Sequence, residues 1–174
     1  MNLEERLRSI IRDVPDFPKK GILFKDITPL LADAALFDAT IAGLAEPHAR
    51  DGVDAVAAVE SRGFIFGSPL AGRLHAGFVP IRKPGKLPYR TVRQSYALEY
   101  GTDTLEMHVD AVRPGSKVLI VDDLLATGGT ASAAAALVRG QGATIVAVTF
   151  VVELTFLKGR DRLDGIPVRS LVRY

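Results

Sequence analysis

Two adjacent acids, Asp122 and Asp123, follow the aliphatic run Val118–Val121 and stand just before a segment of small residues with two glycines. That segment leads into an alanine-rich stretch of helical character, so its backbone amides would point at an anion. Glycine lets the backbone approach a ligand closely, and threonine hydroxyls add further donors. Neighbouring carboxylates suit the hydroxyls of a sugar attached to that anion, and ribose 5-phosphate meets both requirements. The predicted phosphate ligands are Ala126, Thr127, Gly128, Gly129 and Thr130, beside the ribose ligands Asp122 and Asp123.

The segment differs from the common nucleotide-binding loops. It lacks the lysine of the GxxxxGK[ST] loop and is not a GxGxxG sequence, so a monophosphate fits it better. The chain has no cysteine, which excludes disulfides, thiolate zinc sites, iron–sulfur clusters and cysteine nucleophiles. Its three histidines are scattered and fit no catalytic triad or metal cluster. We expect structural roles for His48, His75 and His108.

A second candidate loop, ESRG at residues 60–63, follows the apolar run Val53–Val59. An arginine can hold two phosphate oxygens in a fork, and the glycine after it permits a tight backbone. Taken alone, Ser-Arg-Gly is more often a surface turn. The loop becomes a candidate because it follows a predicted strand, as the aspartate pair does.

A third candidate is the cationic stretch from Arg82 to Arg90, which contains four cations and no acid. Proline and glycine within it indicate a loop. A charge run of this kind is usually a solvated face. Next to an anionic ligand it could instead bind phosphate groups.

The predicted elements explain how these loops could meet. Short apolar runs at 53–59, 77–81, 117–121 and 143–152 read as strands, and helical segments at 64–76 and 130–139 follow the first and third of them. Such alternation indicates a parallel sheet covered on both faces, with ligands at the carboxyl ends of its strands. We also expect an opening helix that Pro15 ends, a helix over 33–49, and a hairpin formed by residues 95–108.

Composition limits the classes of function. Of 174 residues, 48% are hydrophobic and 24% charged, as in ordinary globular proteins, and the net charge of +2 is weak evidence for nucleic-acid binding. The opening residues lack the apolar core of a signal peptide, and the longest apolar run, 143–152, is too short to span a bilayer. We therefore expect a cytoplasmic protein that binds neither nucleic acid nor a membrane.

The stretch DDLLATGGT (122–130) resembles the phosphoribosyl pyrophosphate signature of the type I phosphoribosyltransferases, and its wording is similar to that of the adenine-using members. Five further segments resemble this branch of the family in the same order along the chain. They are FPKKGILFKDITPLL (17–31), ESRGFIFG (60–67), IRKPGKLP (81–88), YALEYG (96–101) and VELTFLKGRDRL (152–163).

The resemblance implies a fold and a set of partners. The fold would be α/β of the type I phosphoribosyltransferase kind, a twisted, mainly parallel sheet flanked by helices in a single domain over 1–174. Residues 1–31 would form an N-terminal helix and a base-binding hood, and residues 82–108 a flexible hairpin lid. The family further implies a homodimer and Mg²⁺ that bridges pyrophosphate and ribose oxygens, with no direct protein ligand required.

The same resemblance implies roles for individual residues. The lid would close over the site and exclude water. Glu60 stands where the family commonly has aspartate, which leaves its role open. The loop at 60–63 would bind pyrophosphate, often through an unusual peptide bond. The implied pyrophosphate ligands are Ser61, Arg62, Gly63, Arg82, Lys83, Lys86 and Tyr100.

For the base, the resemblance implies that Phe24 stacks on adenine while backbone groups of Leu23 and Lys25 read its edge, with Leu124 beside them. Lys25 stands where the family often has arginine, a change of little weight if only backbone is used. Glu99 would exchange a proton with a ring nitrogen.

The implied reaction is purine salvage, in which adenine and 5-phosphoribosyl 1-pyrophosphate (PRPP) give AMP and pyrophosphate. Two alternatives stay open. Enzymes for 6-oxopurines share the fold but usually carry aspartate where Ala126 stands, and they lack the hood. Repressors and attenuators that sense PRPP reuse the fold, but no helix-turn-helix precedes residue 16, and Glu99 would serve no purpose in a sensor.

Overall fold

The computed structural model describes residues 1–98 and 101–174. Its centre is a five-stranded sheet in the order β4-β3-β7-β8-β9, and every neighbouring pair is parallel. The bounds are β3 Ala55–Val59, β4 Gly77–Ile81, β7 Lys117–Leu125, β8 Thr144–Glu153 and β9 Val168–Arg173. The predicted parallel sheet is confirmed, although β9 was not predicted.

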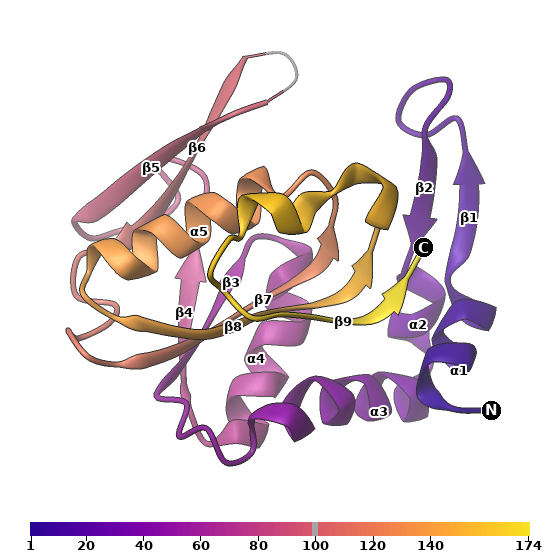
Figure 1. Ribbon diagram of the computed structural model, residues 1–174, viewed down its shortest axis with the longest axis horizontal. Helices are drawn as coiled ribbons and strands as arrows, with labels where there is room; N and C mark the ends of the chain where they lie inside the picture. The colour runs from indigo at the N-terminus through magenta and orange to yellow at the C-terminus, as the bar shows by residue number, and fades with distance from the viewer. Residues whose placement is uncertain (99–100) are drawn as a thin grey trace.

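Helices cover both faces of this sheet, with α5 (Gly129–Gly140) above it and α3 (Ala34–Ala45) and α4 (Arg62–Leu74) below it in Figure 1. Successive residues of each strand point to opposite faces of the sheet, because side chains alternate along a strand. Val56 and Leu119 belong to the apolar cluster with α3 and α4, whereas Ala57 and Ile120 belong to the cluster with α5. The sheet is therefore buried on both sides, and open positions remain only at its edges and strand ends.

Two antiparallel hairpins stand at opposite sides of the sheet (Figure 1). One pairs β1 (Arg12–Pro15) with β2 (Leu23–Asp26) and forms the predicted hood region. The other pairs β5 (Thr91–Ala97) with β6 (Thr102–His108) in the region predicted as a lid. The remaining elements are α1 Leu3–Ile10, α2 Thr28–Ala32 and the 3₁₀ turns Glu46–His48, Thr155–Leu157 and Gly159–Arg162.

The opening helix is shorter than predicted. Its apolar spacing extends to Val14, but α1 ends at Ile10 and Val14 lies in β1 opposite Phe24. Pairing with β2 satisfies the backbone of residues 12–15, so tertiary contact overrides a local pattern that fitted a helix. A search of the described residues for a helix of membrane-spanning length and hydropathy found none.

Candidate active site

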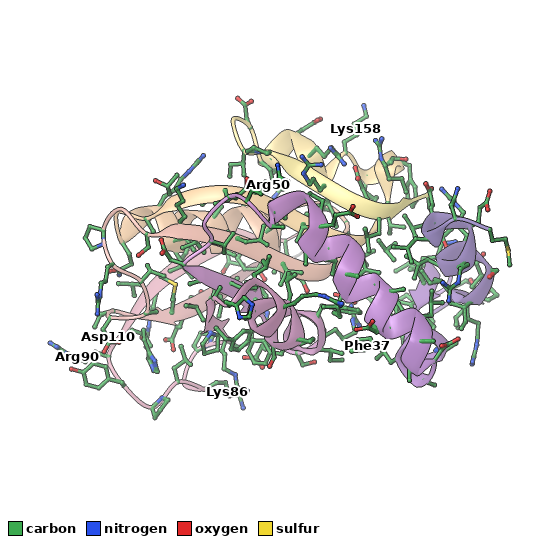
Figure 2. The ribbon with its side chains drawn as sticks, turned by 90° about the horizontal axis from the view of Figure 1, so that it is seen from below. Phe37, Arg50, Lys86, Arg90, Asp110 and Lys158 are labelled. Carbon is green, nitrogen blue, oxygen red and sulfur yellow. The ribbon has the colours of Figure 1, made fainter. Side chains whose placement is uncertain are left out.

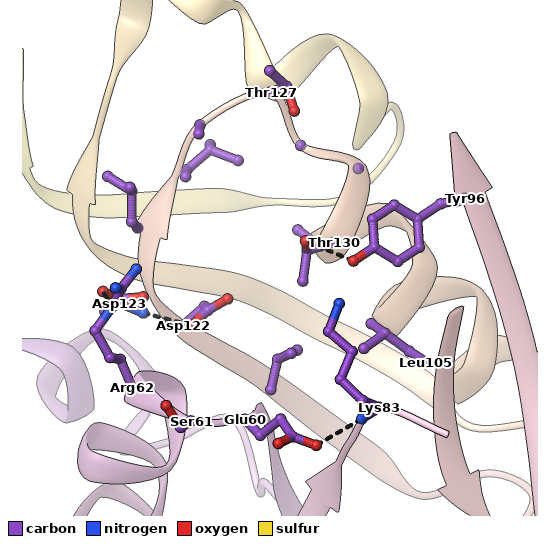
Figure 3. A pocket seen from close by; sticks show the side chains of 17 residues that line it. Glu60, Ser61, Arg62, Lys83, Tyr96, Leu105, Asp122, Asp123, Thr127 and Thr130 are labelled. Atoms are coloured by element: carbon purple, nitrogen blue, oxygen red, sulfur yellow. Dashed lines mark hydrogen bonds and ion pairs between the residues drawn. The ribbon is translucent and has the colours of Figure 1, made fainter. Parts of the chain in front are cut away.

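A cavity of about 410 Å³ opens at the carboxyl ends of β3 and β7 (Figure 3). The loop after β3, the end of β7, the start of α5 and the β5–β6 hairpin all contribute side chains to it. Its lining is Val59, Glu60, Ser61, Arg62, Lys83, Tyr96, Leu105, Asp122, Asp123, Leu124, Leu125, Ala126, Thr127, Gly128, Gly129, Thr130 and Ala131. The cavity thus brings together the predicted ribose and phosphate ligands with part of the predicted pyrophosphate loop.

The two aspartates lie within the last residues of β7, which extends to Leu125 and is longer than the predicted strand. The backbone N–H of Asp123 donates to Oδ1 of Asp122 at 2.8 Å, and Nε of Arg62 donates to Oδ2 of Asp123 at 2.5 Å. Burial, and then the negative charge of Asp123, raise the pKa of Asp122 well above its usual value. Two carboxyl groups therefore lie side by side, and Arg62 pairs with one of them, Asp123.

The loop after β3 is fitted closely to this pair. The Glu60–Ser61 peptide bond is cis, the unusual bond that the resemblance implied. A Cβ atom on Gly63 would lie 2.9 Å from Oδ1 of Asp122 and 3.4 Å from the carbonyl oxygen of Val121. Only glycine therefore lets α4 begin this close to β7, and Arg62 reaches Asp123 as a result.

Glu60, whose role was left open, connects two loops of the site. Its Oε1 accepts from the backbone N–H of Lys83 at 2.7 Å and from Nε of Arg82 at 3.2 Å. Burial raises the pKa of Glu60, but the Lys83 amide and the Arg82 guanidinium outweigh it, and the net pKa is lowered. Glu60 is thus an ionised anchor for the start of the cationic stretch.

The segment at 126–130 forms the predicted turn into a helix. Gly128 has φ +83° at the N-cap of α5, and no acidic residue lies in the first turn of that helix. The free amides of this turn border the cavity, and the positive end of the helix dipole adds to their attraction for an anion. Thr127 is exposed at the rim, while Thr130 lies deeper beside the hairpin (Figure 3).

The β5–β6 hairpin reaches this turn through Tyr96, which lies opposite Asp103 in the pairing. The hydroxyl of Tyr96 accepts from Oγ1 of Thr130 at 3.3 Å and donates to Oδ2 of Asp103 at 3.3 Å. The same carboxylate binds the ammonium group of Lys83. A chain of polar contacts therefore links the start of α5 with Lys83 across the cavity.

The other cations of the predicted lid lie outside the cavity. Arg82 is bound to Glu60, and its Nη1 donates to the carbonyl oxygen of Lys86 at 3.3 Å. Lys86 and Arg90 project away from the sheet (Figure 2). Lys83 lines the cavity, whereas Arg82 and Lys86 do not. Because Glu60 neutralises Arg82, contact of that residue with pyrophosphate would require a change of partner.

The hood places its aromatic side chain near Arg62. The ring of Phe24 lies 5.5 Å from Cζ of Arg62 and makes an edge contact with Phe17 at 5.1 Å between centroids. Lys25 points elsewhere, with its ammonium 3.7 Å from the centre of the Tyr174 ring. Leu23 is exposed. Of the four predicted base ligands, Leu124 lines the cavity, and Phe24 approaches it through Arg62.

Two predicted residues, Glu99 and Tyr100, lie outside the described residues, so their placement carries no argument. Conversely, Tyr96, Asp103 and Leu105 were not predicted as site residues, and the structure brings them to the cavity or to Lys83. The pairing of the predicted hairpin gave one signal for them. Residues that lie opposite one another on a hairpin, such as Tyr96 and Asp103, share a face. That face could not be assigned to the cavity without the tertiary structure.

The histidines lie apart from the cavity lining. His48 is buried and pairs through Nδ1 with Asp51 at 2.8 Å, while His108 accepts from the backbone N–H of Tyr89 at 3.3 Å. Within residues 1–98 and 101–174, no group of three His, Cys, Asp or Glu side chains could hold a metal ion.

Comparison with known proteins gives consistent matches. A sequence profile of the phosphoribosyl transferase domain matches residues 31–169. The adenine phosphoribosyltransferase of Thermosynechococcus vestitus is 58% identical over 168 residues, which cover 97% of this chain and 99% of that relative.

Solved structures agree with the sequence match. The adenine phosphoribosyltransferase of Thermoanaerobacter pseudethanolicus has a TM-score of 0.94 at 55% identity, covering 99% of this chain and 100% of its own. That of Saccharomyces cerevisiae, in complex with adenine and an imino-altritol bisphosphate, has a TM-score of 0.92 at 42% identity, covering 97% and 98%. The likeness therefore includes the hood and the hairpin as well as the sheet.

Proposed function

The chain belongs to the phosphoribosyl transferase family, and from this premise we propose that it transfers the phosphoribosyl group of PRPP to adenine, giving AMP and pyrophosphate. The observation that carries the proposal is the cavity at the end of β7, where two carboxylates adjoin an anion-binding turn. Nearly the whole chain matches relatives named for this activity. The chain is thus a glycosyltransferase of purine salvage.

The end of β7 and the start of α5 suit the ribose 5-phosphate part of PRPP. The phosphate would accept hydrogen bonds from the amides at 127–130, and Asp122 and Asp123 would accept from the ribose hydroxyls. When pyrophosphate leaves, positive charge develops on the sugar, as in other oxocarbenium-like glycosyl transfers. The acidic pair lies where it would favour that charge.

The pyrophosphate would lie between the cis loop and Lys83. Ser61 and Lys83 both line the cavity, and Arg62 is about half exposed, with 46% of its side chain accessible. Lys83 would exchange Asp103 for a phosphate oxygen, since both groups accept charge-assisted hydrogen bonds from an ammonium group. Arg62 would remain near Asp123 and connect this subsite with the hood.

Adenine would enter on the side of Leu124 and Phe24. The yeast relative was solved with adenine, which supports the same base here. Phe24 lies outside the cavity lining but contacts Arg62, which borders the cavity, and an aromatic ring in this position could stack on the base. Glu99 is proposed to exchange the proton at the ring nitrogen, a role that depends on the sequence resemblance alone.

Mg²⁺ is part of the proposal, and the donor set of the site fits it. Two carboxylates face one guanidinium at the cavity, so a cation that arrives with the substrate would offset their repulsion. Magnesium prefers substrate phosphates together with few carboxylates. Asp122 and Asp123 would help to hold it at the site, and it would supply charge neutralisation for the leaving group.

A homodimer and a cytoplasmic location also remain predictions of the resemblance. Light scattering of the purified protein tests the first, since a dimer has twice the chain mass of 18.7 kDa. A single-chain mass at micromolar concentration would contradict it. Fractionation of cells that express the protein tests the second.

The deciding experiment is a product assay. The protein is incubated with Mg²⁺ and PRPP, separately with adenine, hypoxanthine, guanine and orotate, and each nucleotide is measured by chromatography. Formation of AMP alone supports the proposal. IMP or GMP at a comparable rate would assign the site to 6-oxopurines. No nucleotide from any base, with PRPP still bound, would favour a PRPP sensor.

A further inference from the structure

The motif VELTFLKGRDRL at 152–163 has no role in the proposed reaction, yet it contains a charged pair at the end of β8. Glu153 is 3% exposed. Its Oε1 accepts from Nε of Arg160 at 2.6 Å, and its Oε2 accepts from Nη2 of the same arginine at 2.7 Å. Ser170 donates a third hydrogen bond to Oε2 at 2.7 Å. Both carboxylate oxygens of Glu153 are therefore satisfied.

The pair fixes the turn that carries Arg160. The third guanidinium nitrogen, Nη1, donates to the carbonyl oxygen of Val168 at 3.0 Å, so Arg160 joins β8 to the start of β9. A two-point arginine–carboxylate contact sets an orientation as well as a distance. The residue just before the arginine is Gly159, and its backbone position is consequently fixed relative to the sheet.

Gly159 lies directly against the predicted phosphate loop. A Cβ atom on Gly128 would lie 2.3 Å from the carbonyl oxygen of Gly159, and a Cβ atom on Gly159 would lie 2.3 Å from the carbonyl oxygen of Ala126. The two backbones touch without any intervening side chain. A second link is the hydrogen bond from the backbone N–H of Leu154 to the carbonyl oxygen of Leu125, at 2.9 Å.

We propose that Glu153 and Arg160 are positioning residues for the phosphate loop, acting through the backbone of Gly159. Neither side chain lines the cavity, so neither would touch the substrate. The ion pair holds Gly159, and Gly159 supports the loop from the side away from the ligand. This inference extends the proposed function, because it assigns a support to the ribose 5-phosphate subsite of that activity.

A purely structural role would leave the charge unexplained. Glu153 is buried and Arg160 is 38% exposed. Replacing an ion pair that has a buried member with apolar side chains is often neutral or stabilising, so stability alone gives weak reason for such a pair. Orientation gives a better reason, since displacement of a binding group by about 1 Å can cost about 10²-fold in activity. The amides of residues 127–130 must converge on one phosphate, and that requirement is sensitive to such displacements.

The test is the affinity for ribose 5-phosphate, measured by calorimetry without base or pyrophosphate. Arg160→Lys keeps the charge and removes the fork, and Glu153→Gln keeps the size and removes the charge. We expect each to raise the Kd for ribose 5-phosphate about 10- to 100-fold. The KM for adenine at saturating PRPP should change by less than about threefold, because the support acts on one subsite.

The matched control is Arg73→Lys. Arg73 pairs with the exposed Asp38 at 3.1 Å, away from the cavity lining, and its substitution should leave the Kd unchanged. Gly159→Ala tests the contact itself and should weaken ribose 5-phosphate binding at least as strongly. If one of these variants fails to fold, the others still decide the question.

Two results would overturn the inference. One is an unchanged Kd for ribose 5-phosphate in folded Arg160→Lys and Glu153→Gln. The other is an equal loss of adenine and ribose 5-phosphate binding, which indicates general loosening of the fold. A failed proposed function looks different, because the unmodified protein would then form no AMP while its ribose 5-phosphate affinity could still be compared with the variants.

Discussion

The phosphate loop at 126–130 and the β5–β6 hairpin border the same cavity but are held differently. The loop rests on backbone, with Gly128 and Gly129 buried and Gly159 in contact behind it. The base of the hairpin is anchored by the buried Leu105 and Met107, whereas its described outer residues 97–98 and 101–102 are exposed. Leu105 lines the cavity, and the hairpin makes its polar contacts with the site through Tyr96 and Asp103.

This difference leads us to expect a preformed subsite at the phosphate loop and a subsite at the hairpin whose side chains rearrange on binding. Backbone contacts with Gly159 brace the phosphate loop, so we expect binding there to cost little reorganisation. On the hairpin side Asp103 forms an ion pair with Lys83, and pyrophosphate at the proposed subsite would have to displace that carboxylate. We therefore expect changes in the loop to alter affinity for ribose 5-phosphate, and changes in the hairpin to alter catalysis or pyrophosphate binding.

The largest effect is expected for Glu99→Gln in the hairpin sequence. If Glu99 is the proposed general acid–base group, its loss should lower kcat by about 10²–10⁴ while PRPP binding stays nearly intact. Steady-state kinetics with adenine, together with calorimetry of PRPP, measure both quantities. Glu46→Gln, at a turn outside the cavity lining, is the control. An unchanged kcat would remove Glu99 from the mechanism.

Gly128→Ala should have the next largest effect, now on the loop side. The added Cβ would lie 2.3 Å from the carbonyl oxygen of Gly159, and φ at this position is +83°, which disfavours any side chain. The loop must shift, and the Kd for ribose 5-phosphate should rise about 10²-fold. Gly140→Ala, with open space around its Cβ, is the control at the other end of α5. Equal affinities for the two variants would contradict a preformed loop.

Asp103→Asn should have a smaller effect with the opposite sign. It removes the carboxylate that competes for Lys83, so the KM for PRPP should fall, by up to about fivefold if this partly exposed pair is worth about 0.2–1 kcal/mol. Asp110→Asn, in the exposed turn after β6, serves as the control. A rise in KM would mean that Asp103 orients Lys83 for pyrophosphate, and the hairpin would then be preformed as well.

The smallest effect concerns stability. Because burial and Asp123 raise the pKa of Asp122 above its usual 3.8, the ionised form costs folding free energy near neutral pH. Asp122→Asn removes that charge at nearly the same size and should therefore raise Tm there. Thermal unfolding followed from pH 3 to 8 measures it.

The pH dependence has a definite sign. Below about pH 3.8 Asp122 is protonated in the folded and unfolded states, so the variant and the unmodified protein should converge. Their difference should grow as pH rises through the raised pKa of the folded state. If the variant is less stable at neutral pH, the carboxylate contributes favourable contacts there. Its ionised form would then not destabilise the fold at this end of β7.

Much of the loop side could be predicted from sequence, because its chemistry is local. Asp122, Asp123 and the turn at 126–130 are adjacent in the chain, and their position after a strand follows from the apolar pattern. The parallel sheet followed from the same pattern. Strand β9 was not predicted. It pairs with β8, and nothing in the local sequence of β9 required that pairing.

The hairpin side was less predictable, because its chemistry depends on distant pairings. Lys83 and Asp103 meet only after β4 and β6 are in place, and Arg82 turns to Glu60 for the same reason. Sequence indicated that cations were present but not which of them faced the cavity. Glu153 and Arg160 were visible as part of a motif, whereas their link to the phosphate loop runs through backbone contacts that no residue type reveals.

The central position of β7 also bears on how the chain folds. Its neighbours β3 and β8 lie before and after it in sequence, and both must pair before the phosphate loop has its supports. Parallel pairings of this kind form slowly, because the long connection between the two strands must be closed before their contacts can form. Only the completed fold offers the sugar-phosphate subsite. Substrate present at 100 times its Kd would therefore raise the free energy of unfolding by about 2.7 kcal/mol. We expect cells depleted of substrate to lose the protein to proteolysis faster, in addition to losing its turnover.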